Sequence, residues 1–267
     1  MARVGGHHRR VHYFERLGES RFAATEHTQG AWNRAEQHIA PSLGLLAHAV
    51  EQDRDRRRDD RLPLTRLSYD ILGTVPIAAV EVDVQVRRPG RSIELVEATM
   101  SHAGRAVLVL RVWLMQRFGT EQLAGSSFAP IPSPEDTPAW DMSALWRGGF
   151  IASADVRRRE VGPGRATAWV RTNVGLLAGE TVSPAAAAIG LLDIGNGLAV
   201  RADPAQVAFP NIDLTAHLFS EPRGGWLGFD TTVSFGADGL GLTHSVIHDE
   251  TGPIGSSSQM LTVRPVA

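Results

Sequence analysis

Residues 183–192 read SPAAAAIGLL, and four strand-like segments follow: NIDLTAHLFS (211–220), WLGFDTTVSF (226–235), GLTHSVIH (241–248) and IGSSSQMLTV (254–263). The run Pro184–Leu192 predicts an Ala-rich helix, and Ser183 is placed to cap it. Antiparallel strands after a single helix favour an α+β fold, with one sheet curled around that helix. The gaps between the strands are too short for the interleaved helices of a doubly wound α/β fold.

The first half of the chain follows the same order. A helix is predicted over Ala40–Asp53, because Pro41 suits a first helical turn and the apolar residues after it recur at helical spacing. The Arg/Asp-rich stretch Arg54–Arg61 is interpreted as a solvated loop. Strands are predicted in the segments Thr65–Leu72, Ala78–Val86, Ser92–Ser101 and Ala106–Met115.

Matching turns indicate that the two halves are repeats. His102–Ala106 in the first half and Glu250–Ile254 in the second occupy the same place in the order of elements. Further strands are predicted at Phe150–Glu160 and Arg165–Val174, before the second helix. The Pro-, Ser- and Gly-rich segment is the natural linker, so the predicted division is 11–118, a linker at 119–138, and 139–267.

Composition narrows the classes of function. The 267 residues carry a net charge of −2, which gives no electrostatic argument for binding nucleic acid. There is no cysteine, so disulfides, thiolate metal sites and cysteine nucleophiles are excluded. Met1–Arg10 lacks the apolar stretch of a secretory signal, and no apolar run is long enough for a membrane span. A cytoplasmic protein without a membrane span is expected.

Several longer patterns resemble one family of enzymes. They are FPNIDLTAHL (209–218), WLGF (226–229), TVSFG (232–236), HDETGPIG (248–255) and the pair Ser258-Gln259, together with Gly30-Ala31-Trp32 and LDIGNG (192–197). These are similar to the TesB-like acyl-CoA thioesterases. The resemblance covers nearly the whole chain and implies a double hotdog, in which each repeat wraps an antiparallel sheet around a central helix.

The resemblance also implies a catalytic set in the second half. By position in the motifs, Asp213 would accept a proton from the hydrolytic water, while Ser234 and Gln259 would hold the water or orient the carboxylate. Ser234 stands where the family has threonine, and Thr232 is the competing residue. The oxyanion would be stabilised at the start of a central helix, near Ile39–Ser42 or Val182–Ala185.

Each of these residues also has a structural interpretation. Asp213 could be a turn or capping residue, Gln259 an exposed strand residue, and Ser234 an ordinary strand hydroxyl. His38, just before the first helix, is interpreted either as a pocket residue or as a structural histidine. Asp193 is expected to shape the end of the second helix, with a place in the active site as the minority alternative, and the six tryptophans are expected mainly in the core.

The sequence therefore predicts a thioester hydrolase acting on a fatty acyl-CoA, with His38 and Thr232 as substrate-binding residues and with neither cofactor nor metal. A homodimer is expected. Two alternatives stay open: a non-catalytic acyl-CoA- or lipid-binding hotdog protein, and a hotdog hydratase or dehydratase that pairs a histidine with an acid.

Overall fold

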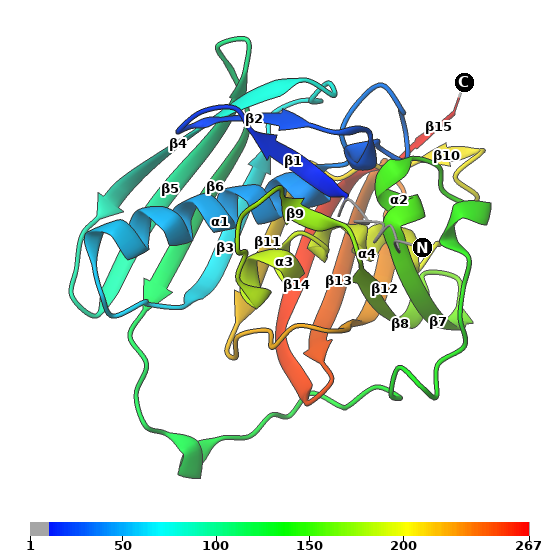
Figure 1. Ribbon diagram of the computed structural model, residues 1–267. Coiled ribbons are helices and arrows are strands. Elements are labelled where there is room, and N and C mark those ends of the chain that lie inside the picture. The colour runs from blue at the N-terminus through cyan, green and yellow to red at the C-terminus, as the bar shows by residue number, and fades with distance from the viewer. Residues whose placement is uncertain (1–10, 267) are drawn as a thin grey trace, which may run out of the picture.

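The strands of both halves form one continuous sheet. The structure is a computed structural model that describes residues 11–266; the basic stretch Met1–Arg10 falls outside the described residues. Thirteen strands lie in the order β7-β8-β12-β13-β14-β11-β3-β6-β5-β4-β2-β1-β9 (Figure 1). In the first half these are β1 (His12–Arg16), β2 (Arg21–Ala24), β3 (Leu64–Ile71), β4 (Ala79–Arg88), β5 (Ile93–His102) and β6 (Arg105–Met115). In the second half they are β7 (Ala154–Gly162), β8 (Arg165–Thr172), β9 (Gly175–Leu177), β11 (Asp213–Leu218), β12 (Leu227–Phe235), β13 (Leu240–Asp249) and β14 (Gly252–Thr262).

The order of strands repeats about the centre of the sheet. Moving outward, β3-β6-β5-β4-β2-β1 in one direction matches β11-β14-β13-β12-β8-β7 in the other. The two halves meet where β3 and β11 pair antiparallel, from Asp70 opposite Asp213 to Arg66 opposite His217. A short pair, β10 (Val207–Ala208) with β15 (Arg264–Pro265), closes one end of the second half. The repeated order is the arrangement expected of a duplicated unit.

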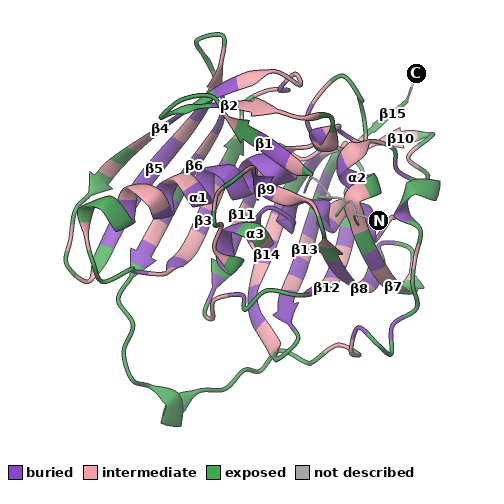
Figure 2. Ribbon diagram, viewed as in Figure 1, coloured by how far each residue is buried: buried purple, intermediate pink, exposed green. Residues whose placement is uncertain are grey.

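One long helix fills the concave side of the first half (Figure 2). Helix α1 (Ile39–Arg57) has buried residues on most of its circumference, including Leu43, Leu46 and Val50. Full burial of side chains of this size contributes about 1.5–3 kcal/mol each. The helix therefore belongs to the core rather than to the surface.

The second half has a broken helix in the equivalent place. Helix α3 (Pro184–Ile189) is followed by a 3₁₀ turn at Leu192–Ile194 and by α4 (Gly195–Leu198), so the helix predicted over Pro184–Leu192 ends early. Helices α1 and α3 touch at glycines: a Cβ on Gly44 would lie 2.8 Å from the Ala186 carbonyl oxygen and 2.9 Å from Gly190 Cα. This close contact of the two helices tolerates no side chain.

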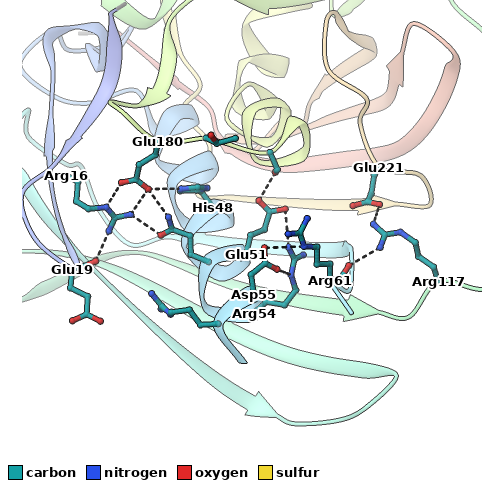
Figure 3. A pocket seen from close by; sticks show the side chains of 14 residues that line it. Arg16, Glu19, His48, Glu51, Arg54, Asp55, Arg61, Arg117, Glu180 and Glu221 are labelled. Carbon is teal, nitrogen blue, oxygen red and sulfur yellow. Dashed lines mark hydrogen bonds and ion pairs between the residues drawn. The ribbon is translucent and has the colours of Figure 1, made fainter. Parts of the chain in front are cut away.

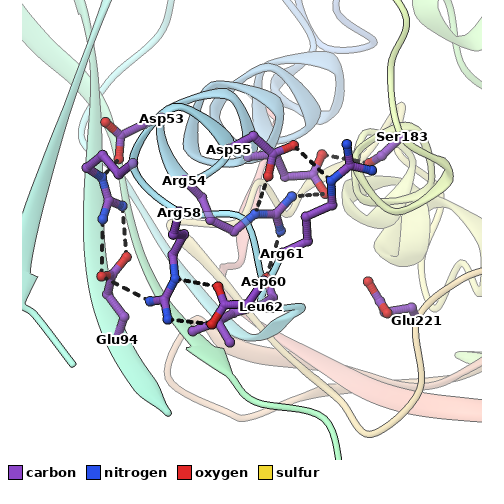
Figure 4. Close-up of polar contacts among 12 residues, drawn as sticks. Asp53, Arg54, Asp55, Arg58, Asp60, Arg61, Leu62, Glu94, Ser183 and Glu221 are labelled. Atoms are coloured by element: carbon purple, nitrogen blue, oxygen red, sulfur yellow. Dashed lines mark hydrogen bonds and ion pairs between the residues drawn. The ribbon is translucent and has the colours of Figure 1, made fainter. Parts of the chain in front are cut away.

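Two other expectations need correction. The Arg/Asp-rich stretch was expected to be a loop from Arg54 onward, but α1 continues to Arg57. Its arginines are held by ion pairs, since Arg57 contacts Asp53 at 2.7 Å and Glu94 at 2.8 Å, and Arg58 contacts Glu94 at 3.4 Å (Figure 4). At the start of the second half, Phe150 lies in a short helix, α2 (Gly149–Ser153), and the strand begins at Ala154.

The segment between the halves has little regular structure. Apart from two short 3₁₀ turns, at Glu121–Leu123 and Met142–Ala144, residues 116–148 run as an extended connection (Figure 1). The division at residues 119–138 remains a prediction. Within residues 11–266, no helix is long and apolar enough to cross a membrane.

Candidate active site

A buried carboxylate, Asp193, receives hydrogen bonds from two side-chain amides. Its Oδ1 accepts from Nδ2 of Asn211 at 2.6 Å and from Nε2 of Gln259 at 2.8 Å. Its other oxygen, Oδ2, lies 3.7 Å from Nδ1 of His38. Asp193 is 4% exposed and Gln259 is 2% exposed, so the amide–carboxylate group is almost removed from solvent.

Burial changes the acid–base behaviour of this group. The pKa of Asp193 is raised to about 7, because desolvation of the carboxylate outweighs the two amide hydrogen bonds that favour the charged form. Burial also lowers the pKa of His38 to about 3, so the imidazole is neutral at physiological pH. A carboxylate that gains and loses its proton near neutral pH is suited to act as a general base.

Three different elements bring these groups together. Asp193 sits in the 3₁₀ turn where the second helix breaks, and Asn211 lies just before β11. Gln259 comes from β14, where its neighbours Ser258 and Met260 point to the opposite side of the sheet, because side chains alternate along a strand. The geometry thus depends on the break in the helix and on the register of β14.

The start of helix α1 lies beside the buried carboxylate of Asp193. His38 caps the helix, since its Nδ1 accepts from the Ala40 N–H at 3.2 Å, which places the ring proton on Nε2. The Ile39 N–H, at the first helical position, has no acceptor among residues 11–266. The amide without an acceptor and the dipole of a 19-residue helix favour a negative charge beside this helix terminus.

Of the residues that form the site, all except Gln259 line one cleft between the halves. Its cavity volume is about 590 Å³, and its lining includes Asp193, Asn211, His38 and Ile39. The walls are partly apolar and also carry polar side chains, among them Glu36 and Gln37. The larger apolar residues of the lining are Trp32, Ile71, Leu72, Val75, Pro210 and Val266. Arg264 also lines it. An apolar cleft with a few converging polar groups is the usual form of a site for a small molecule.

The structure does not bring Asp213, Ser234 and Gln259 together. Asp213 stands at the start of β11, and its Oδ1 accepts from the Met260 backbone N–H at 2.6 Å. Ser234 is exposed on β12 opposite Leu242, and the partly exposed Thr232 donates to the His244 carbonyl at 3.4 Å. Among the residues expected from the sequence, Gln259 and His38 lie at the buried carboxylate.

Of the two residues that were not expected at the site, only Asp193 has a signal in the sequence that could have identified it. Asp193 follows Leu191 and Leu192 and precedes Ile194, so a carboxylate interrupts an apolar run that must be buried. A buried carboxylate is costly unless it is paired or functional. Asn211 carries no comparable signal, because an asparagine after a proline is ordinary in a turn.

A larger cavity at the other end of the helix pair is unlike the cleft. It measures about 890 Å³, and none of its lining residues, all within the described part of the chain, has a large apolar side chain. Its polar groups bind one another: Glu180 accepts from Arg16 and contacts His48 at 3.3 Å, and Glu51 accepts from Ser183 at 2.6 Å (Figure 3). Because no large apolar side chain lines that cavity for an acyl chain to contact, we assign the chemistry to the smaller cleft.

Comparisons with known proteins agree with this fold. The model of the acyl-CoA thioesterase C-terminal domain matches residues 126–263, and that of the N-terminal domain matches residues 28–115. A hotdog-fold protein of unknown function from Alicyclobacillus acidocaldarius has a TM-score of 0.72 at 13% identity, covering 94% of this chain and 96% of that one. No curated protein matched the chain.

Two solved mycobacterial structures are also similar. An acyl-CoA thioesterase II from Mycobacterium marinum has a TM-score of 0.65 at 16% identity and covers 95% of each chain. A tesB protein from Mycobacterium avium subspecies paratuberculosis has a TM-score of 0.65 at 16% identity, covering 94% of this chain and 96% of that one. At these identities the likeness concerns the fold.

The fold is a double hotdog, and the protein is a thioester hydrolase by class. More particularly, because the C-terminal domain model alone spans more than half of the sequence, the chain belongs to the acyl-CoA thioesterase family.

Proposed function

We propose that the protein hydrolyses a fatty acyl-CoA to the free acid and CoA, with a water molecule activated by Asp193. The observation that carries this proposal is the buried carboxylate whose Oδ1 is occupied by two amides, at 2.6 and 2.8 Å, while Oδ2 is left for the water. A pKa of about 7 lets the same group take a proton from water and release it again near neutral pH.

The reaction follows from this arrangement. Water held at Oδ2 of Asp193 attacks the thioester carbonyl carbon, and its proton passes to the carboxylate. The Ile39 N–H and the α1 dipole stabilise the oxyanion that forms at the carbonyl oxygen. The carbon–sulfur bond then breaks, and the CoA thiolate leaves and is protonated from Asp193 or solvent. Asn211 and Gln259 are positioning residues, because they reach the reaction through the carboxylate.

The walls of the cleft support the substrate class. The apolar side chains, Trp32 and Ile39 among them, would contact the acyl chain. Arg264 is exposed and lies at β15, at the end of the second half, where it would meet a phosphate of CoA. His38 would bind substrate as part of the wall, as expected from the sequence.

The test is release of the CoA thiol, followed with a thiol-reactive dye, from a series of straight-chain acyl-CoAs. We expect release that is first order in enzyme and saturates with substrate. Binding of an acyl-CoA without release at any chain length would contradict hydrolysis and favour the acyl-binding alternative.

A hotdog hydratase is the second candidate function, and one contact between His38 and Asp193 favours it. His38 and Asp193 approach to 3.7 Å, which is the pairing of a histidine with an acid that such a reaction requires. However, His38 Nδ1 already accepts from the Ala40 N–H, and its imidazole is neutral. Hydration of crotonyl-CoA without CoA release would favour the hydratase.

The homodimer and the cytoplasmic location also remain proposals, and light scattering of the purified protein tests the homodimer.

A further inference from the structure

Trp32 stands between the cleft and a second, much smaller cavity. The cleft of about 590 Å³ and the small cavity of about 20 Å³ are both lined by Trp32, His38 and Asn196. Behind Trp32 the lining of the small cavity is mainly apolar, with Met142, Trp146, Ile151 and Ile194. A cavity of this size has room for about one water molecule. Trp32 and its neighbours thus end the cleft on this side.

Trp32 is held by other aromatic rings. Its ring centroid lies 5.0 Å from Trp146 and 5.3 Å from Phe209, in edge-to-face geometry. Pairs in this geometry stabilise the packing of the rings beyond the effect of the buried area alone. Trp32 is nevertheless 44% exposed, whereas Trp146 is 5% exposed and donates its indole N–H to the Gly197 carbonyl at 3.1 Å. Trp146 is therefore the fixed back wall, and Trp32 is the barrier in front of it.

The loop that carries Trp32 is anchored at its base. The Gly30 N–H donates to the Glu36 carbonyl at 2.8 Å, and the Phe150 N–H donates to the Gln29 carbonyl at 3.2 Å. Gly148 lies so close that a Cβ there would be 2.5 Å from the Gly30 carbonyl oxygen. Because the backbone on both sides is tied down, the indole has a defined position relative to His38 and Ile39.

We propose that Trp32 is a specificity-determining residue that limits the length of the acyl chain the cleft accepts. This inference rests on the proposed function, since it places the thioester carbonyl at Ile39 and Asp193. An acyl chain directed from that point toward Asn196 meets the indole, beyond which the cavity holds no methylene chain. The wild-type protein then prefers acyl chains that end before the indole, and loss of the indole joins the cleft to an apolar space walled by Trp146, Ile151 and Ile194.

The test is the chain-length profile of kcat/KM from butyryl-CoA to palmitoyl-CoA for the wild type, Trp32→Ala and Trp32→Leu. Each further buried methylene is worth about fourfold in affinity, so room for two of them gives an increase of about 15-fold in relative kcat/KM for longer chains. Phe219→Ala is the matched control, because it removes another exposed aromatic ring, 60% exposed, at the far end of β11 from Asp213. Its profile is expected to match that of the wild type.

Binding separates this inference from the proposed hydrolysis. The same acyl-CoA series is titrated calorimetrically into Asp193→Asn and into Asp193→Asn combined with Trp32→Ala. A shift of the preferred length toward longer chains supports the role of Trp32 even if no variant releases CoA. Unchanged chain-length preference in both binding and hydrolysis, for folded Trp32→Ala or for Trp32→Leu, would overturn it.

Discussion

Gln259 and Asp193 lie 66 residues apart in the sequence and are joined by a buried hydrogen bond of 2.8 Å from the amide Nε2 to the carboxylate Oδ1. Asn211 donates to the same oxygen at 2.6 Å. Two donors on one oxygen fix the orientation of the carboxylate and leave the second oxygen for chemistry. They also favour the charged form of a group whose burial favours the neutral form.

The first prediction concerns pH. Because the base must be ionised, kcat/KM of the wild type should rise as pH increases through about 7, the pKa of Asp193. Gln259→Ala removes a hydrogen bond that lowers this pKa, so the rising limb should move to higher pH. Loss of a hydrogen bond to a charged group should also reduce kcat/KM by about 10- to 100-fold. A lower rate with an unmoved pH profile would argue against the proposed positioning role.

The second prediction concerns Ser234, whose side chain lies on the exposed face of the sheet. Ser234 is exposed, while Thr231 on the same strand is buried against Ser245 at 2.8 Å. Ser234→Ala should therefore leave kcat and KM within about twofold of the wild type, and stability within about 0.5 kcal/mol, as for other surface positions. Steady-state kinetics decide the point. A loss as large as that of Gln259→Ala would return Ser234 to the reaction.

The contact of the two helices gives a third prediction. Gly44→Ala places a methyl group 2.8 Å from the Ala186 carbonyl oxygen. Although alanine is the better helix former by about 1 kcal/mol, the crowding should cost about 1–3 kcal/mol, so urea unfolding should report a net loss of stability. Gly162→Ala is the control, since nothing lies within 4 Å of its Cβ position. A Gly44→Ala protein more stable than the wild type would contradict this packing.

Acid stability supplies the fourth prediction. The pKa of Glu180 is lowered from 4.5 to about 2, chiefly by the hydrogen bond from Arg16 and further by His48 and Gln52. A depressed carboxyl pKa stabilises the folded state above about pH 4.5, and this contribution is lost as pH falls toward 2. Glu180→Gln should lower stability at neutral pH and flatten the loss of stability over that acidic range. Parallel stability curves for the two proteins would contradict the assignment.

The strands were predictable because their apolar residues alternate. In β12, Phe229 and Val233 are buried, and in β14 Gln259 and Leu261 are buried, so the same alternation also separates inward from outward side chains. Applied to the catalytic set predicted from the motifs, this alternation places the side chain of Ser234 on the side of the sheet opposite to that of the buried Val233. Ser234 therefore lies on the outer face. The motif alone carries no such information about direction.

The position of Asp193 in the candidate site depends on contacts between helices that cannot be inferred from the sequence pattern. The second helix breaks near Gly190, where α1 approaches so closely that Gly44 has no room for a side chain. That break turns Asp193 toward Asn211 and Gln259. A sequence pattern predicts a helix at this point but does not predict its packing partner, so the carboxylate was expected at the helix end rather than in the site.

The most direct test of the central claim compares two aspartates of the same half. Asp193→Asn and Asp213→Asn each remove one carboxylate, and unfolding curves establish that both proteins are folded. Release of CoA is then measured with a thiol-reactive dye on the acyl-CoA that the wild type hydrolyses fastest. Loss of a general base should reduce kcat of Asp193→Asn by about 10²- to 10⁴-fold. Asp213→Asn should keep most of the activity, because that carboxylate binds the Met260 backbone N–H. Normal release by Asp193→Asn together with loss in Asp213→Asn would contradict the account.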